Sequence, residues 1–192
     1  MDAVIYIIRH GQTAVNRAHA LQGRSDHPLN EEGIRQAEEA GAWFRGQGIV
    51  FDHVFTSPLI RAVQTAKLCA PGTEPVTDAR LIEMDYGPYE GCDLKNPPAE
   101  IVSFFSDFIH CPAPDGMEQL ADVVRRTGTL IEEIRGLKGN ILLSTHAIAM
   151  KGILEYLTPA SEGMYWSKYI GNCAVYAAEI SAGQISVPAE IR

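Results

Sequence analysis

The sequence predicts an α/β fold, a three-layer α/β/α sandwich with a mainly parallel central sheet. Strand-like and helix-like segments alternate along the 192 residues with short connections, which is typical of this architecture. The first strand-like run, Ala3–Ile8, is apolar without polar alternation, as in a strand covered by helices on both faces. No internal repeat or linker divides the chain, so we expect one domain over residues 1–192.

The N-terminal half predicts two further strands and two helices. Asn30 is a good N-cap followed by two glutamates, so a helix should begin there and end near Gly46–Gly48. Its expected apolar face consists of Ile34, Ala37, Gly41 and Phe44. His53–Thr56 and Pro75–Thr77 are predicted strands. Between them, Ser57–Pro58 should open a second helix, because proline is tolerated in a first helical turn.

The next segment predicts an insert and then a return to the sandwich. Residues 84–116 are rich in Pro, Gly and turn residues, and we expect a lid-like insert there with one helix over Glu100–His110. Met117–Leu137 predicts an amphipathic helix. Its apolar face consists of Leu120, Val123, Val124, Thr127, Ile131 and Ile134. A buried strand at Asn140–Ser144 and a helix at Ile148–Leu157 follow.

The C-terminal part predicts a closing hairpin. Cys173–Ile180 and Gln184–Val187 are the two strands, and Gly183 lies in the turn between them. The last segment, Ser186–Arg192, either packs on its own domain or extends to a second copy. The oligomeric state therefore stays open, with a homodimer as one alternative.

Composition and charge exclude several classes of partner. The net charge of −8 opposes binding to the nucleic-acid backbone, and no apolar run is long enough for a membrane helix. The run Val4–Ile8 is too short for a signal sequence, so we expect a cytoplasmic protein with no membrane partner. The four cysteines are scattered without a C-x-x-C pair, which favours free thiols over a disulfide framework or a zinc site.

The first candidate for chemistry is Arg9–His10–Gly11, directly after the first strand. In open α/β sheets the ligand lies beyond the carboxyl ends of the strands. The imidazole of His10 is a competent nucleophile near neutral pH, and Arg9 can bind phosphate oxygens with its planar fork. Taken alone, the three residues also suit a structural histidine beside a surface arginine.

His146 follows the strand Asn140–Ser144 as His10 follows the first strand. Two histidines at the ends of two buried strands can meet at one site. A metal site would need further carboxylate or histidine ligands, whereas these histidines are accompanied by arginines. We therefore expect an anion rather than a metal.

Two other residues belong with these histidines. Arg61 lies near the start of the predicted helix after Ser57–Pro58, where the helix N-terminus already favours anions. Glu83 can donate a proton to a leaving oxygen and then activate water. Asp85 and Glu90 are nearby carboxylates, and chemistry alone does not separate the three.

Together these motifs resemble the histidine phosphatase superfamily, the phosphoglycerate mutase-like group. The resemblance spans most of the chain, and its specificity lies in the order and spacing of the motifs. The matching positions are Arg9–Thr13, Asn16, Gln22–Gly23, Pro28–Gly33, Gln36–Ala37, Ser57–Leu59, Arg61, Gln64–Ala66, Leu81–Glu83, Gly87, Glu90–Gly91, Ser144–His146 and Asn172.

The resemblance implies no metal and no organic cofactor, and it implies a role for each of these site residues. His10 is the expected phospho-accepting nucleophile and Glu83 the general acid and base. Arg9, Arg61 and His146 are expected to hold the phosphoryl oxygens and stabilise their charge in the transition state. Further phosphate contacts are expected from Asn16, Gly23 and Ala147. Family members commonly have glycine at the position of Ala147, which leaves the local backbone geometry in question.

The insert favours hydrolysis over transfer of phosphate to a second alcohol. Mutases of this family carry cations in a longer insert, whereas residues 84–116 contain only Lys95 as a cation. The insert is rich in aromatic residues, which suit an apolar or neutral leaving group or else form the insert's own core. They are Tyr86, Tyr89, Phe104, Phe105 and Phe108. We therefore predict a phosphomonoesterase acting on small phosphorylated metabolites.

Three alternatives stay open. The same pocket suits phosphoglycerate mutase-type transfer, and the family also contains phosphatases that act on a ribazole precursor of cobalamin. A pseudoenzyme that only binds phosphorylated ligands would be expected to lack His10 or Glu83, and both are present.

Overall fold

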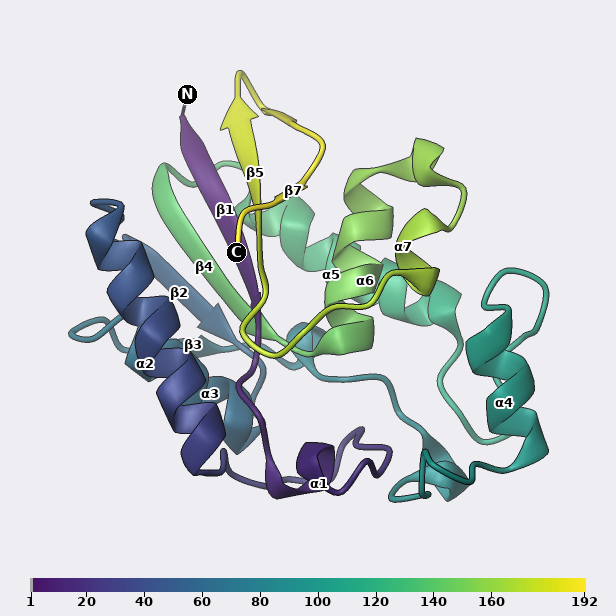
Figure 1. The fold of residues 1–192 in the computed structure, drawn as a ribbon. Coiled ribbons are helices and arrows are strands. Elements are labelled where there is room, and N and C mark those ends of the chain that lie inside the picture. The colour runs from purple at the N-terminus through teal and green to yellow at the C-terminus, as the bar shows by residue number, and fades with distance from the viewer. Residues whose placement is uncertain (1) are drawn as a thin grey trace.

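The central sheet of the protein lies between two layers of helices (Figure 1). The structure, a computed structural model, describes residues 2–192. In this part of the chain the sheet has seven strands in the order β3-β2-β4-β1-β5-β6, with β7 pairing to β5. The strands are β1 (Ala3–Arg9), β2 (His53–Thr56), β3 (Val76–Thr77), β4 (Gly139–Thr145), β5 (Val175–Ser181), β6 (Gln184–Ile185) and β7 (Ala189–Glu190).

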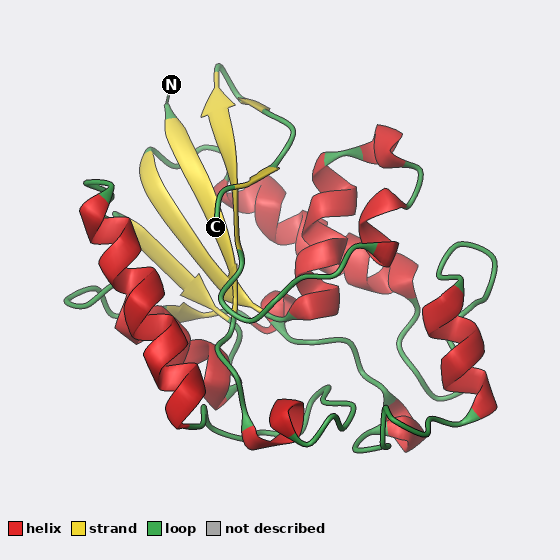
Figure 2. Ribbon diagram, in the orientation of Figure 1, coloured by secondary structure: helices red, strands yellow, loops and turns green. Residues whose placement is uncertain are grey.

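Helices cover both faces of the sheet, as Figure 2 shows in red and yellow. The α-helices are α1 (Ala14–Arg17), α2 (Glu31–Gly46), α3 (Ile60–Cys69), α4 (Ala99–Ser106), α5 (Leu120–Ile134), α6 (Ala147–Leu157) and α7 (Met164–Ser167). Short 3-10 helices occur at Ala79–Leu81, Gly87–Tyr89 and Pro159–Ser161.

The side chains of β1 show why the sandwich has three layers. Ile5 and Ile7 belong to the hydrophobic cluster that includes residues of α5 and α6. Tyr6 and Ile8 belong to the cluster on the other face, with residues of α2 and α3. Because successive side chains of a strand point to opposite faces, an apolar strand without alternation is buried on both. The predicted three-layer fold is confirmed.

The sheet is parallel in its larger part and antiparallel at one edge. Strand β4 pairs in parallel with both β1 and β2, and β2 with β3. Strand β5 runs antiparallel to β1 and forms the predicted hairpin with β6. The C-terminal segment returns to its own sheet, because β7 pairs with β5 and Arg192 Nη1 donates to the Cys173 carbonyl at 2.9 Å.

Two details of the first helices differ from the prediction. Asn30 caps α2 by accepting a hydrogen bond from the Gly33 N–H, as expected, but Ile34 is 38% exposed and does not belong to the buried face. Ala40 takes that place. Helix α3 begins at Ile60, so Pro58 precedes it. Ser57 Oγ accepts from the Leu59 N–H, which holds the connection in a turn before the helix starts.

The insert 84–116 has a small apolar cluster of its own, shared with α5 and α6. Helix α4 ends at Ser106, four residues before the predicted end, and Ile101 and Phe104 are its buried residues. Helix α5 begins at Leu120 rather than Met117, because Met117 is buried in the insert's cluster and the Glu118 N–H donates to the Asp85 carbonyl.

Within residues 2–192, no helix combines the length and apolarity needed to cross a membrane. All four cysteines are free, with Cys69 and Cys173 buried and Cys92 and Cys111 half-buried.

Candidate active site

The two histidines lie side by side at the carboxyl ends of β1 and β4. These strands pair in parallel with Arg9 opposite Thr145, so each histidine is the next residue of its strand. The imidazole centroids are 5.1 Å apart at an interplanar angle of 61°. The backbone N–H of His10 donates to the Thr145 carbonyl at 2.9 Å. This bond fixes the segments that follow β1 and β4 to one another. The predicted convergence of the two histidines is confirmed.

The ring of His10 is held with one nitrogen free. Its Nδ1 lies 2.7 Å from the Gly11 carbonyl, and since a carbonyl only accepts, the proton sits on Nδ1 and the lone pair on Nε2. Burial holds the pKa of His10 well below its usual value, and the charges of Arg9 and Arg61 lower it further. The imidazole is therefore neutral and nucleophilic at and below neutral pH.

Close backbone packing fixes the loop after His10. A Cβ atom on Gly11 would lie 2.4 Å from the carbonyl oxygen of Gly33, so only glycine fits this approach of the loop to the start of α2. The Gly11 N–H donates to Thr65 Oγ1 at 3.1 Å. Asn172 Nδ2 donates to the His10 carbonyl at 2.9 Å.

Arg61 and His146 form a buried pair behind His10. Arg61 Nε donates to His146 Nδ1 at 3.2 Å, and the two other nitrogens donate to the carbonyls of Ser25 and Gly23 at 2.8 and 2.6 Å. Because His146 Nδ1 accepts, its Nε2 carries the proton and donates to Ser57 Oγ at 2.7 Å. Burial, followed by the charge of Arg61, holds the pKa of His146 well below its usual value.

Arg9 has hydrogen-bonding capacity to spare. Its Nη1 donates to the Ile170 carbonyl at 2.5 Å, while the buried Nε has no partner within residues 2–192. Burial lowers the pKa of the guanidinium, and the carboxylate of Glu83 opposes that shift. A buried donor without a partner is costly unless a ligand supplies the acceptor.

Glu83 is seated on the N-terminus of α6. Its Oε1 accepts from the N–H groups of Met84, Ile148 and Ala149 at 2.9, 3.1 and 3.0 Å. Its Oε2 accepts one longer bond, from the Ile148 N–H at 3.2 Å. The carboxylate is thus anchored mainly through one oxygen, and the other retains capacity for a further partner.

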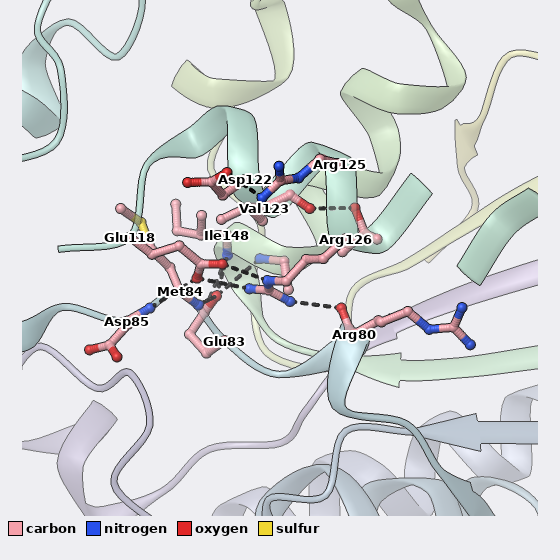
Figure 3. A network of polar contacts seen from close by, with 12 residues as sticks. Arg80, Glu83, Met84, Asp85, Glu118, Asp122, Val123, Arg125, Arg126 and Ile148 are labelled. Atoms are coloured by element: carbon pink, nitrogen blue, oxygen red, sulfur yellow. Dashed lines mark hydrogen bonds and ion pairs between the residues drawn. The ribbon is translucent and has the colours of Figure 1, made fainter. Parts of the chain in front are cut away.

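The backbone on either side of Glu83 is clamped by an ion pair with little solvent exposure (Figure 3). Arg126 of α5 pairs with Glu118 at 2.7 Å, with side-chain exposures of 17% and 12%. Arg126 Nη1 donates to the Arg80 carbonyl at 2.7 Å, and Glu118 Oε2 accepts from the Asp85 N–H at 3.2 Å. This ion pair, here called the clamp, therefore binds the backbone three residues before Glu83 and two residues after it.

A cavity of about 420 Å³ opens above His10. Its floor includes Arg9, His10, Asn16, Glu83 and Ala147. The side chains that form its walls come from segments far apart in the sequence: Leu21, Gln22, Tyr86, Leu94, Phe105, Phe108, Ile148, Lys151, Trp166, Ser167, Lys168, Tyr169 and Ile170. The aromatic residues of the insert divide, because Tyr86, Phe105 and Phe108 line the cavity whereas Phe104 is core.

The structure separates the three carboxylates that the sequence left open. Glu83 lines the cavity. Glu90 accepts instead from the Gly23 N–H and from Ser25, and Asp85 pairs with Arg24 at the surface. Only Glu83 is placed to exchange a proton with a group bound beside His10.

The prediction for Gly23 stays a prediction, and the one for Ala147 is sharpened. The Gly23 N–H donates to Glu90 and its carbonyl accepts from Arg61, so Gly23 helps to hold Arg61 in place. It is not among the residues that line the cavity. Ala147 is the first residue of α6 and has no positive φ. Alanine therefore fits this position without strain, and its N–H lies at a helix N-terminus.

Two cations of the cavity were not predicted. Lys151 comes from α6 and Lys168 from the segment after α7, so counting cations in the insert alone missed both. A lysine in the otherwise apolar run Ile148–Leu154 was the available signal for the first. Lys168 follows no such pattern, and only the tertiary fold places it at the cavity.

Within the described residues, no group of three or more His, Cys, Asp or Glu side chains is arranged to hold a metal ion. The ionisable groups around the cavity are instead mostly cationic, with Arg9, Lys151 and Lys168 against Glu83.

Comparison with known proteins supplies a family context. The family model described as "Histidine phosphatase superfamily (branch 1)" matches residues 5–189. A curated relative, the probable phosphoglycerate mutase GpmB of Yersinia pestis, is 34% identical over 161 residues, which cover 80% of this chain and 74% of the relative.

Solved structures agree in fold. The phosphoserine phosphatase of Entamoeba histolytica, in complex with 3-phosphoglyceric acid, superposes with a TM-score of 0.84 at 24% identity, covering 99% of this chain and 97% of that one. A putative alpha-ribazole-5'-P phosphatase of Escherichia coli gives a TM-score of 0.82 at 22% identity, with coverages of 97% and 95%.

Proposed function

The chain belongs to the histidine phosphatase superfamily, and on that premise we propose that it hydrolyses small phosphate monoesters through a phosphohistidine on His10. The observation that carries the proposal is the free Nε2 of a neutral, buried His10 beside Arg9 and Glu83 at the floor of one cavity. A cytoplasmic location belongs to the same proposal and rests on the sequence alone.

In the first step, Nε2 of His10 attacks phosphorus and the bond between phosphorus and the ester oxygen breaks. Glu83 gives its proton to the departing alkoxide through Oε2, the oxygen with spare capacity. In the second step a water molecule attacks the phosphohistidine, Glu83 takes its proton, and the phosphorus–nitrogen bond breaks. Inorganic phosphate leaves, and His10 and Glu83 return to their starting states.

The charge of the phosphoryl group is met by residues already held in position. Arg9 offers its unpartnered Nε, and Asn16 and the Ala147 N–H lie at the same floor. The ring of His146 packs against that of His10, and Arg61 donates to His146. Their mutual hydrogen bond gives way when an anion supplies better acceptors. Donors that are fixed before the reaction cost no reorganisation in the transition state.

The same site suits transfer to a second alcohol, and one observation favours that alternative. The cavity contains Lys151 and Lys168, cations of the kind that hold a substrate while the phosphoryl group is passed on, and the curated relative is named a probable phosphoglycerate mutase. The insert, however, contributes no cation to the lining of the cavity, which supports hydrolysis. We keep hydrolysis as the proposal.

The test is turnover of aryl phosphates by His10→Ala. We expect the wild-type protein to release phosphate and to carry acid-labile phosphate after rapid quenching, and the variant to lose at least about 1,000-fold in kcat. Full activity in the variant would contradict the nucleophile. Incubation with phosphoglycerates, with and without a bisphosphate primer, separates the two reactions, because a mutase interconverts the isomers faster than it releases phosphate.

A further inference from the structure

Lys151 is a buried cation that faces the ligand cavity. It is one turn into α6, retains 9% of its exposure, and lines the cavity together with Arg9 and His10. Its Nζ donates to the Trp166 carbonyl at 2.6 Å and lies 5.2 Å from the ring centroid of Phe108. An ammonium has three donors, and the structure uses one of them in a hydrogen bond to the protein.

No carboxylate within residues 2–192 forms an ion pair with Lys151. The other lysine of the cavity differs, since Lys168 pairs with Glu190 at 2.9 Å. Buried charges are ordinarily paired, because removing an ion from water is costly. Burial of the Lys151 ammonium therefore has a desolvation free energy that the folded protein alone does not offset.

The charge of the cavity is opposite to that of the whole protein. Three cations and one carboxylate line it, namely Arg9, Lys151, Lys168 and Glu83, although the chain has a net charge of −8. The phosphoryl group accounts for the cation at the floor, Arg9. Lys151 lines the same cavity and is not needed for that group.

We propose that Lys151 binds a second anionic group on the leaving alcohol, so that the preferred substrates are phosphate monoesters that also carry a carboxylate or a second phosphate. The inference rests on the proposed function and assigns its specificity to one side chain. The aromatic wall then packs against the carbon skeleton between the two anions, and the nearby ring of Phe108 stabilises the ammonium.

The test compares two esters that differ in one group. 3-Phosphoglycerate carries a carboxylate where glycerol 3-phosphate has a hydroxymethyl group. For Lys151→Met, which keeps the length of the side chain and removes its charge, we expect kcat/KM on 3-phosphoglycerate to fall about 10- to 100-fold. On glycerol 3-phosphate we expect a change of less than about 3-fold. Lys151→Arg should retain the preference, and Lys138→Met, an exposed lysine at the start of β4, is the matched control.

A pH series gives a second readout. Burial lowers the pKa of Lys151 to about 8, with Glu83 raising it and Arg9 lowering it. The ratio of kcat/KM between the two esters should therefore fall as pH rises through about 8, because the free enzyme then loses the cation. In Lys151→Arg the ratio should stay level. The bisphosphate of propane-1,3-diol in the same series distinguishes a phosphate from a carboxylate as the preferred second anion.

If Lys151→Met lowers kcat/KM equally on both esters, the lysine is structural. If the variant changes kcat/KM on neither ester, the lysine binds no anion. Either result overturns the inference and leaves the proposed function standing, since glycerol 3-phosphate is still hydrolysed by the wild type. Failure of the wild type to hydrolyse any ester or to form phosphohistidine would overturn both.

Discussion

The floor and the wall of the cavity are built in different ways. The floor is centred on the carboxyl ends of β1 and β4, where His10, the proposed nucleophile, is fixed by hydrogen bonds to the Gly11 and Thr145 carbonyls. The wall is assembled from the insert, from α6 and from the segment around α7. The residues for phosphate chemistry are therefore positioned mainly by the sheet. The fit of the rest of a substrate depends on side chains that only the tertiary fold brings together.

The largest effect is expected from a substitution at Gly11 that introduces a steric clash beside His10. In Gly11→Ala the new Cβ would lie 2.4 Å from the Gly33 carbonyl oxygen, so the loop after His10 must shift against the start of α2. Overpacking of this kind costs about 1–3 kcal/mol of unfolding free energy. A shift of the nucleophile by about 1 Å costs about 100-fold in kcat. Denaturant titration and aryl phosphate turnover measure the two effects.

Gly46→Ala is the matched control for that substitution. Gly46 is the last residue of α2, is exposed, and has no atom within 4 Å of the Cβ position. We expect its kcat to stay within 2-fold of wild type and its stability to be unchanged or slightly raised, by less than about 1 kcal/mol. If both glycine variants behave alike, close packing does not fix the floor.

An intermediate effect is expected from the clamp beside Glu83. Arg126→Met removes the hydrogen bond to the Arg80 carbonyl and leaves Glu118 without its nearest partner, at a cost of about 1–3 kcal/mol in stability. Because the backbone then no longer holds the Glu83 carboxyl in one position, hydrolysis of esters with poor leaving groups should slow about 10-fold. Esters with good leaving groups need less protonation and should slow less than 3-fold, as they should in Glu83→Gln.

Arg125→Met is the control for the clamp. Arg125 is the neighbouring residue of α5, but its side chain is 76% exposed and pairs only with Asp122 within the described structure (Figure 3). Both stability and leaving-group dependence should be unchanged. A uniform loss over all leaving groups in Arg126→Met would show a general structural role and remove Arg126 from the positioning of Glu83.

The same division separates what the sequence predicts from what it does not. His10 and His146 each follow a buried strand, so their meeting at one sheet edge was predictable. Glu83 follows a 3-10 helix instead, and only the family resemblance distinguished it from Asp85 and Glu90. Lys168 reaches the cavity through a turn with no periodic pattern. The Gly23 N–H donates to Glu90, 67 residues away in the chain, a pairing that spacing does not reveal.

The errors in the predicted helices also arise because tertiary packing is not visible in local sequence patterns. Ile34 fits the apolar period of α2, yet it lies outside the buried face, since the sheet covers only part of the helix circumference. The start of α5 was misplaced because Met117 is buried by the insert rather than by the helix. Local patterns give the existence and type of an element, and tertiary packing sets its ends.

The smallest expected effect tests the wall alone, through two neighbouring residues of α4. Phe105 lines the cavity and Phe104 is buried in the insert's cluster. Phe105→Leu should raise KM for a naphthyl phosphate about 3-fold, by loss of aromatic contact worth about 0.5–1 kcal/mol, and leave kcat unchanged because His10 and Glu83 are untouched. Phe104→Leu should do the opposite, lowering the unfolding free energy by about 1 kcal/mol with KM unchanged. A fall of kcat in Phe105→Leu would mean that the wall also positions the floor, and the two regions would then act as one.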